Sequence, residues 1–247
     1  MPRTLTNAQT TFLDTLRAEL RAHADPIKAA PMQAYMKSAM PYLGILSTPL
    51  AAICRAQIAA TRLPTFAGWR DSILALWRGA AFREERYAAI AIARHRVYDE
   101  HQTLASLPMY REMIVTGAWW DYVDVIASHP IGGLLRRYPA AMSKTLRAWS
   151  QHDDMWLRRS AIIAQLHFGR DLDRRLLYDC IEPSLDSREF FLRKAIGWAL
   201  RQYARTDARE VLRYVNAHRV RLSTLSTREA LKHVGVPPAH TAKIKPR

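Results

Sequence analysis

The chain has 247 residues, and 49% of them are apolar, which is enough to bury a sizeable hydrophobic core. Lys and Arg number 37 against 22 Asp and Glu, which gives a formal charge of +15. Either this charge binds a polyanionic partner, or the folded protein tolerates the repulsion between its own positive charges. The two cysteines exclude a disulfide framework, and no apolar run reaches the roughly 20 residues that a membrane span needs.

Helical periodicity recurs along the whole chain, and no alternating pattern predicts a strand. The predicted helices cover roughly residues 5–22, 27–39, 49–60, 66–78, 83–97, 103–115, 118–128, 139–149, 154–168, 171–181, 187–205, 208–217 and 227–234. We therefore predict an all-α protein. No linker rich in Gly, Ser or Pro divides it, so residues 1–234 are expected to form a single domain.

Some of these helices carry a cap signal, in which Asp or Ser is followed three residues later by Glu. The signals are Asp186 with Glu189, Asp207 with Glu210, and Ser226 with Glu229. Each predicts that a helix begins directly after its cap residue.

Four segments align with one another, and their starts are 36, 36 and 35 residues apart. They are Glu84–Ile90, Trp120–Ile126, Trp156–Ile162 and Phe191–Gly197. A fixed period in an all-helical chain is typical of stacked helix pairs, since each pair buries its apolar face only against its neighbours. We expect an α-solenoid of stacked antiparallel helix pairs with a concave, basic groove. Chance similarity among helices rich in Ala and Arg is the alternative.

The fifth position of this alignment differs in one segment. Ala88, Ser160 and Ala195 place a small side chain there, whereas Asp124 places a carboxylate. A carboxylate at a packed position loses its hydration, so it needs a partner or is retained for chemistry. Asp124 is therefore a candidate catalytic residue.

Basic residues recur at the neighbouring positions of the alignment. Arg86, Arg158 and Arg193 occupy the third position, and Arg159 and Lys194 follow at the fourth. The basic excess is spread along the chain, since residues 1–146 hold 17 basic and 11 acidic residues and residues 147–221 hold 15 and 10. Such a distribution favours an extended surface that follows a phosphate backbone.

Trp120 and Asp124 are four residues apart, so they share one face of a helix and can contact one group together. Asp121 points about 100° away from Trp120. Two structural alternatives stay open. Trp120 could pack in an aromatic core in register with Trp156, and Asp124 could pair with an arginine of a neighbouring repeat.

Lys194, Trp198 and Arg201 lie on one face of a later helix. Basic residues beside an indole suit both phosphate contact and stacking, although core packing is the commoner use of such a Trp. Gly197 is informative, because glycine inside a helix costs about 1 kcal/mol and often marks a close approach of another backbone or a ligand.

Three motifs carry a resemblance to a known family: VTGAWWDYVD over 115–124, WLRRSAI over 156–162 and EFFLRKAIGW over 189–198. In residues, order and spacing they resemble the AlkD-like DNA alkylation repair glycosylases. Tyr35–Lys37, Tyr42–Ile45 and Leu225–His233 extend the resemblance over roughly residues 12–234. The departures lie in residues 1–11 and in a tail rich in Pro and Lys.

The resemblance implies HEAT-like repeats that bind duplex DNA and hydrolyse the N-glycosidic bond of N3- or N7-alkylated purines, leaving an abasic site. It implies that Asp124 is the catalytic carboxylate, that Trp120 and Trp198 contact the deoxyribose, and that Arg159 holds the nearby phosphate. Arg158, Arg193, Lys194 and Arg201 are the further candidate DNA-binding residues. The alternative is a HEAT-like DNA-binding or scaffold protein without catalysis.

Other chemistries find no support in the sequence. The histidines and cysteines do not cluster at the spacing of metal ligands, and no phosphate-binding glycine loop is present, so we expect no cofactor. Double-stranded DNA that contains alkylated purines is the expected partner of a monomeric protein. We expect a cytoplasmic, nucleoid-associated location, and a flexible basic tail over residues 235–247.

Overall fold

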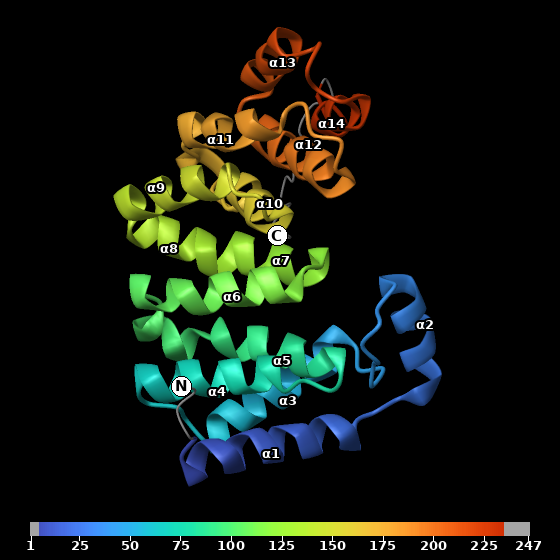
Figure 1. Ribbon diagram of the computed structural model, residues 1–247, viewed down its shortest axis with the longest axis vertical. Helices are drawn as coiled ribbons and strands as arrows, with labels where there is room; N and C mark the ends of the chain where they lie inside the picture. Colours follow the sequence, from blue (N-terminus) through green and yellow to red (C-terminus); the bar gives the residue numbers. More distant parts are fainter. Residues whose placement is uncertain (1–4, 235–247) are drawn as a thin grey trace, which may run out of the picture. The chain divides into compact units, whose positions relative to one another are not determined.

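The computed structural model describes residues 5–234, and every regular element in them is helical (Figure 1). The α-helices are α1 (Asn7–Ala22), α2 (Pro26–Met36), α3 (Ser47–Ala60), α4 (Phe66–Arg78), α5 (Arg83–Ala93), α6 (Leu107–Gly117), α7 (Trp120–Ile126), α8 (Gly132–Arg137), α9 (Pro139–Ser150), α10 (Met155–Ile163), α11 (Arg174–Ile181), α12 (Phe190–Ala204), α13 (Ala208–Ala217) and α14 (Thr224–Ala230). The predicted all-α class is confirmed. None of these helices is long and apolar enough to cross a membrane.

The chain divides into two compact units, with the boundary between Gly117 and Ala118. The single domain expected for residues 1–234 stays a prediction. The tail expected to be flexible, residues 235–247, lies outside the described residues.

The N-terminal unit is a stack of helices that contact their neighbours along the chain. Helix α1 packs on α3 and α4, and α5 packs on both α3 and α4. The fully buried Glu84 of α5 accepts hydrogen bonds from the backbone N–H groups of Leu43, Gly44 and Ile45 at 2.8–3.1 Å. A buried carboxylate needs such donors, so Glu84 holds the segment before α3 against α5.

The C-terminal unit repeats the same principle. Helix α10 packs against both α7 and α12, and α9 packs against both α10 and α11. One apolar core runs through α10–α13 and includes the buried Ile163, Leu192 and Val211. Each helix therefore buries its apolar face against the next pair, which is the packing of an α-solenoid.

The aligned segments lie on equivalent helices, α5, α7, α10 and α12. At the fifth position Ala88, Ser160 and Ala195 are all fully buried, as their small side chains predict. Asp124 is the departure from this pattern, and its side chain keeps 14% exposure. Each of the four aligned segments thus falls on a helix, as the predicted repeat requires.

The helix predicted over residues 118–128 is interrupted. Helix α7 ends at Ile126, and residues 127–131 form a π-helical turn before α8. Pro130 cannot donate an N–H and crowds the carbonyl four residues earlier, so the turn widens until Gly132 N–H reaches the carbonyl of Ala127. A Cβ on Gly132 would lie 2.7 Å from the carbonyl oxygen of Ala164. The glycine lets α8 approach the end of α10.

The cap signals were correct in one case of the three. Asp207 caps α13 by accepting from the backbone N–H of Glu210. The signal at Ser226 was wrong, because Ser223 caps α14 and Ser226 lies inside the helix. The signal at Asp186 was also wrong, because α12 begins at Phe190.

Candidate functional site

The start of α7 is fixed by an aromatic cluster. Ala118 has a positive φ of 43°, and the next residue, Trp119, is the N-cap of α7. The Trp119 ring centroid lies 5.6 Å from that of Phe191 and 6.4 Å from that of Trp156. The sequence left open that Trp120 packs in an aromatic core with Trp156, but in the structure the neighbouring Trp119 packs against Trp156. Trp120 is half-buried and begins the helix one turn before Asp124.

Asp124 and Arg159 form a bidentate ion pair between α7 and α10. Arg159 Nε donates to Asp124 Oδ1 and Nη2 donates to Oδ2, both at 2.7 Å. The third donating nitrogen of Arg159, Nη1, binds the carbonyl oxygen of Phe191 at 2.5 Å. With 4% of its surface exposed, Arg159 is held between α7 and the start of α12. This is the pairing with a neighbouring repeat that the sequence left open for Asp124.

Burial raises the pKa of Asp124 above its ordinary value, because a desolvated carboxylate is harder to ionise. The hydrogen bonds and charge of Arg159 lower the pKa, while the charge of Asp121 raises it further. A carboxylate whose protonation is set by burial and by two opposing neighbours is typical of functional sites, although structural ion pairs share the property.

The face of α12 around Trp198 carries a second charged group. Glu229 of α14 accepts a hydrogen bond from Lys194 Nζ at 3.1 Å and pairs with the guanidinium of Arg201. Trp198 lies between these cations along the helix and packs partly against the apolar core. The sequence marked Glu229 only as part of the cap signal at Ser226. It did not identify Lys194 and Arg201 as its partners, because they lie on another helix.

Gly197 explains how α14 comes so close to α12. A Cβ at this position would lie 2.5 Å from Glu229 Cβ and 2.9 Å from the carbonyl oxygen of Ser226. The expectation that Gly197 marks a close approach of another backbone is confirmed.

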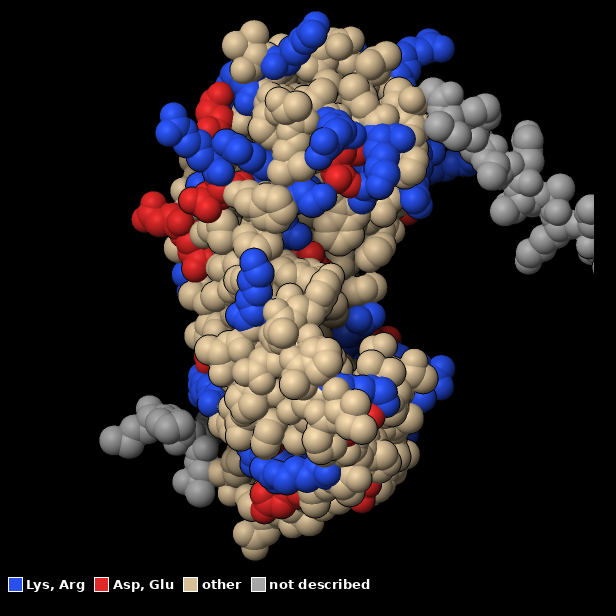
Figure 2. Space-filling view, turned by 90° about the vertical axis from the view of Figure 1, so that its right-hand side faces the viewer, with Lys and Arg blue, Asp and Glu red and all other residues tan. Residues whose placement is uncertain are grey.

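Among residues 5–234, Arg158 and Arg193 donate to neutral acceptors. Arg158 binds the carbonyl oxygen of Pro183 and the hydroxyl of Ser184, and Arg193 binds the carbonyl oxygen of Ser187. Neutral acceptors leave the full positive charge of each guanidinium in place. Figure 2 shows Lys and Arg side chains gathered in the part of the chain around α12–α14, with acidic side chains among them.

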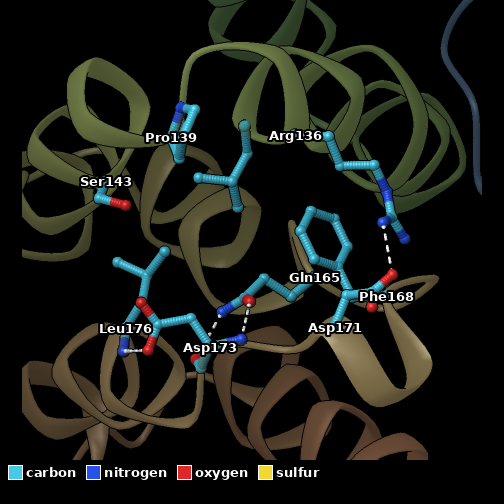
Figure 3. A pocket seen from close by; sticks show the side chains of 9 residues that line it. Arg136, Pro139, Ser143, Gln165, Phe168, Asp171, Asp173 and Leu176 are labelled. Carbon is cyan, nitrogen blue, oxygen red and sulfur yellow. Dashed lines mark hydrogen bonds and ion pairs between the residues drawn. The ribbon is translucent and has the colours of Figure 1, made fainter.

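A separate pocket of about 290 Å³ lies among α8, α9 and the start of α11 (Figure 3). The guanidinium of Arg136 lies 3.9 Å from the ring centroid of Phe168 and donates to Asp171 at 3.2 Å. The side-chain amide of Gln165 makes two hydrogen bonds with the backbone of Asp173. None of the predicted site residues lines this pocket, so its shape says nothing about the chemistry of Asp124.

These features define an all-helical repeat protein in which consecutive repeats supply the two halves of a buried charged site. The chain belongs to the DNA alkylation repair enzyme family, whose profile matches residues 16–234. A solved structure described as "Predicted DNA alkylation repair enzyme from Enterococcus faecalis" is 27% identical and superimposes with a TM-score of 0.77. The match covers 87% of this chain and 98% of the other. A comparison with curated protein sequences gave no match.

Proposed function

We propose that this protein is a monofunctional DNA glycosylase that hydrolyses the N-glycosidic bond of cationic N3- or N7-alkylated purines in duplex DNA. The observation that carries the proposal is the largely buried carboxylate of Asp124, held in a bidentate pair by Arg159, in a chain of the DNA alkylation repair enzyme family. The products would be the free alkylated base and an abasic site.

The chemistry needs only one carboxylate. An alkylated purine with a formal positive charge leaves as a neutral base, so no general acid has to protonate it. As the bond from C1′ to the base nitrogen breaks, the deoxyribose becomes an oxocarbenium-like cation. Asp124 would stabilise that cation and orient or deprotonate the attacking water.

The ion pair with Arg159 is compatible with this role. The two ionised oxygens of a carboxylate offer about four acceptor positions, and a bidentate arginine uses two of them. Arg159 also favours the ionised form of Asp124, because its hydrogen bonds and charge oppose the effect of burial on the pKa. The remaining lone pairs could therefore face a sugar cation or a water molecule.

Trp120 and Trp198 would offer the electron-rich faces of their indoles to the cationic sugar. Arg158, Arg193, Lys194 and Arg201 would contact the DNA backbone along a basic groove. Arg159 would hold the phosphate nearest Asp124 through the N–H groups that Asp124 and Phe191 leave free. Because recognition would act on the sugar and backbone, it would not require a pocket that encloses the flipped base, and bulky adducts should be tolerated. We propose that the protein acts as a monomer on chromosomal DNA in the cytoplasm.

The first prediction tests the catalytic role of Asp124. Asp124→Asn keeps the shape and one acceptor for Arg159 but removes the charge that stabilises the oxocarbenium ion. Release of N7-methylguanine from methylated duplex DNA should fall by about a hundredfold or more, while binding of the duplex is retained. The measurement is chromatography of the released base under single-turnover conditions.

Asp121→Asn is the matched control, because it removes the same charge from the same helix. Its carboxylate accepts a hydrogen bond from the backbone N–H of Tyr122 rather than from Arg159. Base release should stay near that of the native protein at neutral pH. Unchanged release in Asp124→Asn would refute the mechanism, and DNA binding without release by the native protein would favour the non-catalytic alternative.

A further inference from the structure

Glu229 occupies the two cations that flank Trp198. One of its carboxylate oxygens accepts from Lys194 Nζ at 3.1 Å, and the other pairs with Arg201. Lys194 and Arg201 are seven residues apart on α12, which is about two turns along the same face. A single carboxylate from α14 therefore bridges two turns of the helix that carries Trp198.

The position of Glu229 is imposed by the packing of its helix. Its Cβ lies over Gly197, where any side chain on α12 would collide with it. The hydroxyl of Ser226, one turn earlier on α14, donates to the carbonyl oxygen of Arg193 at 3.0 Å. Two contacts with the backbone of α12 thus hold Glu229 in register with Lys194 and Arg201.

The bridge leaves part of the positive charge uncompensated. One carboxylate faces two cations, and the side chain of Lys194 keeps 41% exposure. Lys194 has three N–H donors, of which Glu229 takes one. The side chain of Arg201 is less exposed, at 20%. The group is therefore accessible from solvent on the side of Lys194.

A carboxylate and a phosphodiester resemble each other in their hydrogen-bonding groups. Each presents two oxygens that share one negative charge, and both bind lysine and arginine through charge-assisted hydrogen bonds. The arrangement of Lys194 and Arg201 around Glu229 is thus one that a DNA phosphate could also occupy. Both anions cannot hold the same donors at once.

We propose that Lys194 and Arg201 form a phosphate-binding site beside Trp198, and that Glu229 is an internal competitor that lowers its affinity for the DNA backbone. The proposal rests on the proposed function in one respect, because it takes DNA as the polyanion that the protein binds. Its consequence is weak binding of undamaged duplex at this position, since a phosphate must displace or share a resident carboxylate. Glu229 is then a specificity residue of the binding face rather than a catalytic residue.

The second prediction concerns Glu229→Gln in the full-length protein. The amide keeps the size of the side chain but no longer neutralises Lys194 and Arg201. Affinity for an undamaged duplex should rise about tenfold at roughly 0.1 M salt, and the slope of log affinity against log salt should steepen by about one unit. Fluorescence anisotropy of a labelled duplex over a range of salt concentrations measures both quantities.

Asp179→Asn is the matched control. Asp179 of α11 pairs with Arg147 of α9 at 2.8 Å, with both side chains 39% exposed, so the variant also removes one negative charge and frees a cation of the same unit. Its affinity and salt slope should change much less. An equal gain in both variants would overturn the proposal, because net charge alone would then explain the effect.

A structural role for Glu229 predicts a different result. If the carboxylate only fastens α14, Glu229→Gln should lower the melting temperature and leave the affinity and the salt slope unchanged, which would also overturn the proposal. Base release by the native protein is measured in parallel. Its absence would refute the glycosylase function, whereas the binding data decide the role of Glu229 independently.

Discussion

The protonation of Asp124 depends on two neighbours that act in opposite directions. Burial raises the pKa of its carboxyl, Arg159 lowers it through two hydrogen bonds and its charge, and Asp121 raises it. Because the proposed mechanism needs the ionised form, the sign of each neighbour's effect on catalysis can be stated in advance.

The third prediction is a shift of the acid limb of the pH–rate profile. Base release should fall as the pH drops through the pKa of Asp124, at a pH above the ordinary value of 3.8 for an aspartate. Arg159→Gln should move this limb to higher pH, and Asp121→Asn should move it to lower pH. Single-turnover base release, corrected for spontaneous depurination at each pH, gives the profile. Shifts in the same direction in both variants would contradict the assignment of the limb to Asp124.

At the scale of elements, close packing between α12 and α14 depends on one glycine. The fourth prediction is that Gly197→Ala lowers the free energy of unfolding by about 1–3 kcal/mol. Alanine gains about 1 kcal/mol in helix propensity, but its Cβ would lie 2.9 Å from the backbone oxygen of Ser226, which cannot move alone. The steric effect should therefore exceed the gain. Denaturant unfolding measures the difference.

Gly133→Ala is the control for this substitution. Gly133 lies inside α8, and a Cβ there would meet nothing within 4 Å. The same mutation should therefore stabilise the protein by up to about 1 kcal/mol through helix propensity. If both glycines responded with the same sign, crowding beneath α14 would not be the reason for Gly197.

Elements with a strong apolar period could be predicted from the sequence, and irregular ones could not. The helix predicted over residues 66–78 agrees with α4 at both ends, where Thr65 caps it and Gly79 follows it in the structure. The π-helical turn after Ile126 was missed, since Pro130 only predicts a break, while the way the backbone recovers depends on packing against Ala164. Local sequence signals determine where helices begin and end, but tertiary contacts determine the backbone conformation that connects one helix to the next.

The same limit applies to the candidate site. The repeat alignment singled out Asp124 because three equivalent positions hold buried small residues, and it left an arginine partner open. The spacing could not identify Arg159 as that partner or Glu229 as the bridge between Lys194 and Arg201. The paired residues are 35 or 28 positions apart in the sequence. Only the stacking of their helices brings these side chains together.

At the scale of the whole molecule, the charge of +15 is the property that concerns DNA most directly. Each phosphate neutralised by a Lys or Arg contributes about 0.9 to the slope of log affinity against log salt. A charge in a disordered segment and a charge on a packed helix make the same contribution if both contact the backbone. The salt slope therefore shows which cations take part in binding.

The fifth prediction compares two pairs of substitutions that remove the same charge. Arg158→Gln with Arg193→Gln removes two guanidinium groups of the helical body, whose contacts in the fold are neutral acceptors. Lys243→Gln with Lys245→Gln removes two charges from the tail. We expect the helical pair to reduce the salt slope by about two units and the tail pair by less than about half a unit.

Binding of undamaged duplex in the full-length chain measures both slopes, and circular dichroism checks that each double variant folds. The opposite order would place the phosphate contacts in the tail, and an equal loss in both pairs would mean that the long-range field of the protein, rather than the arginines of α10 and α12, determines its affinity for DNA.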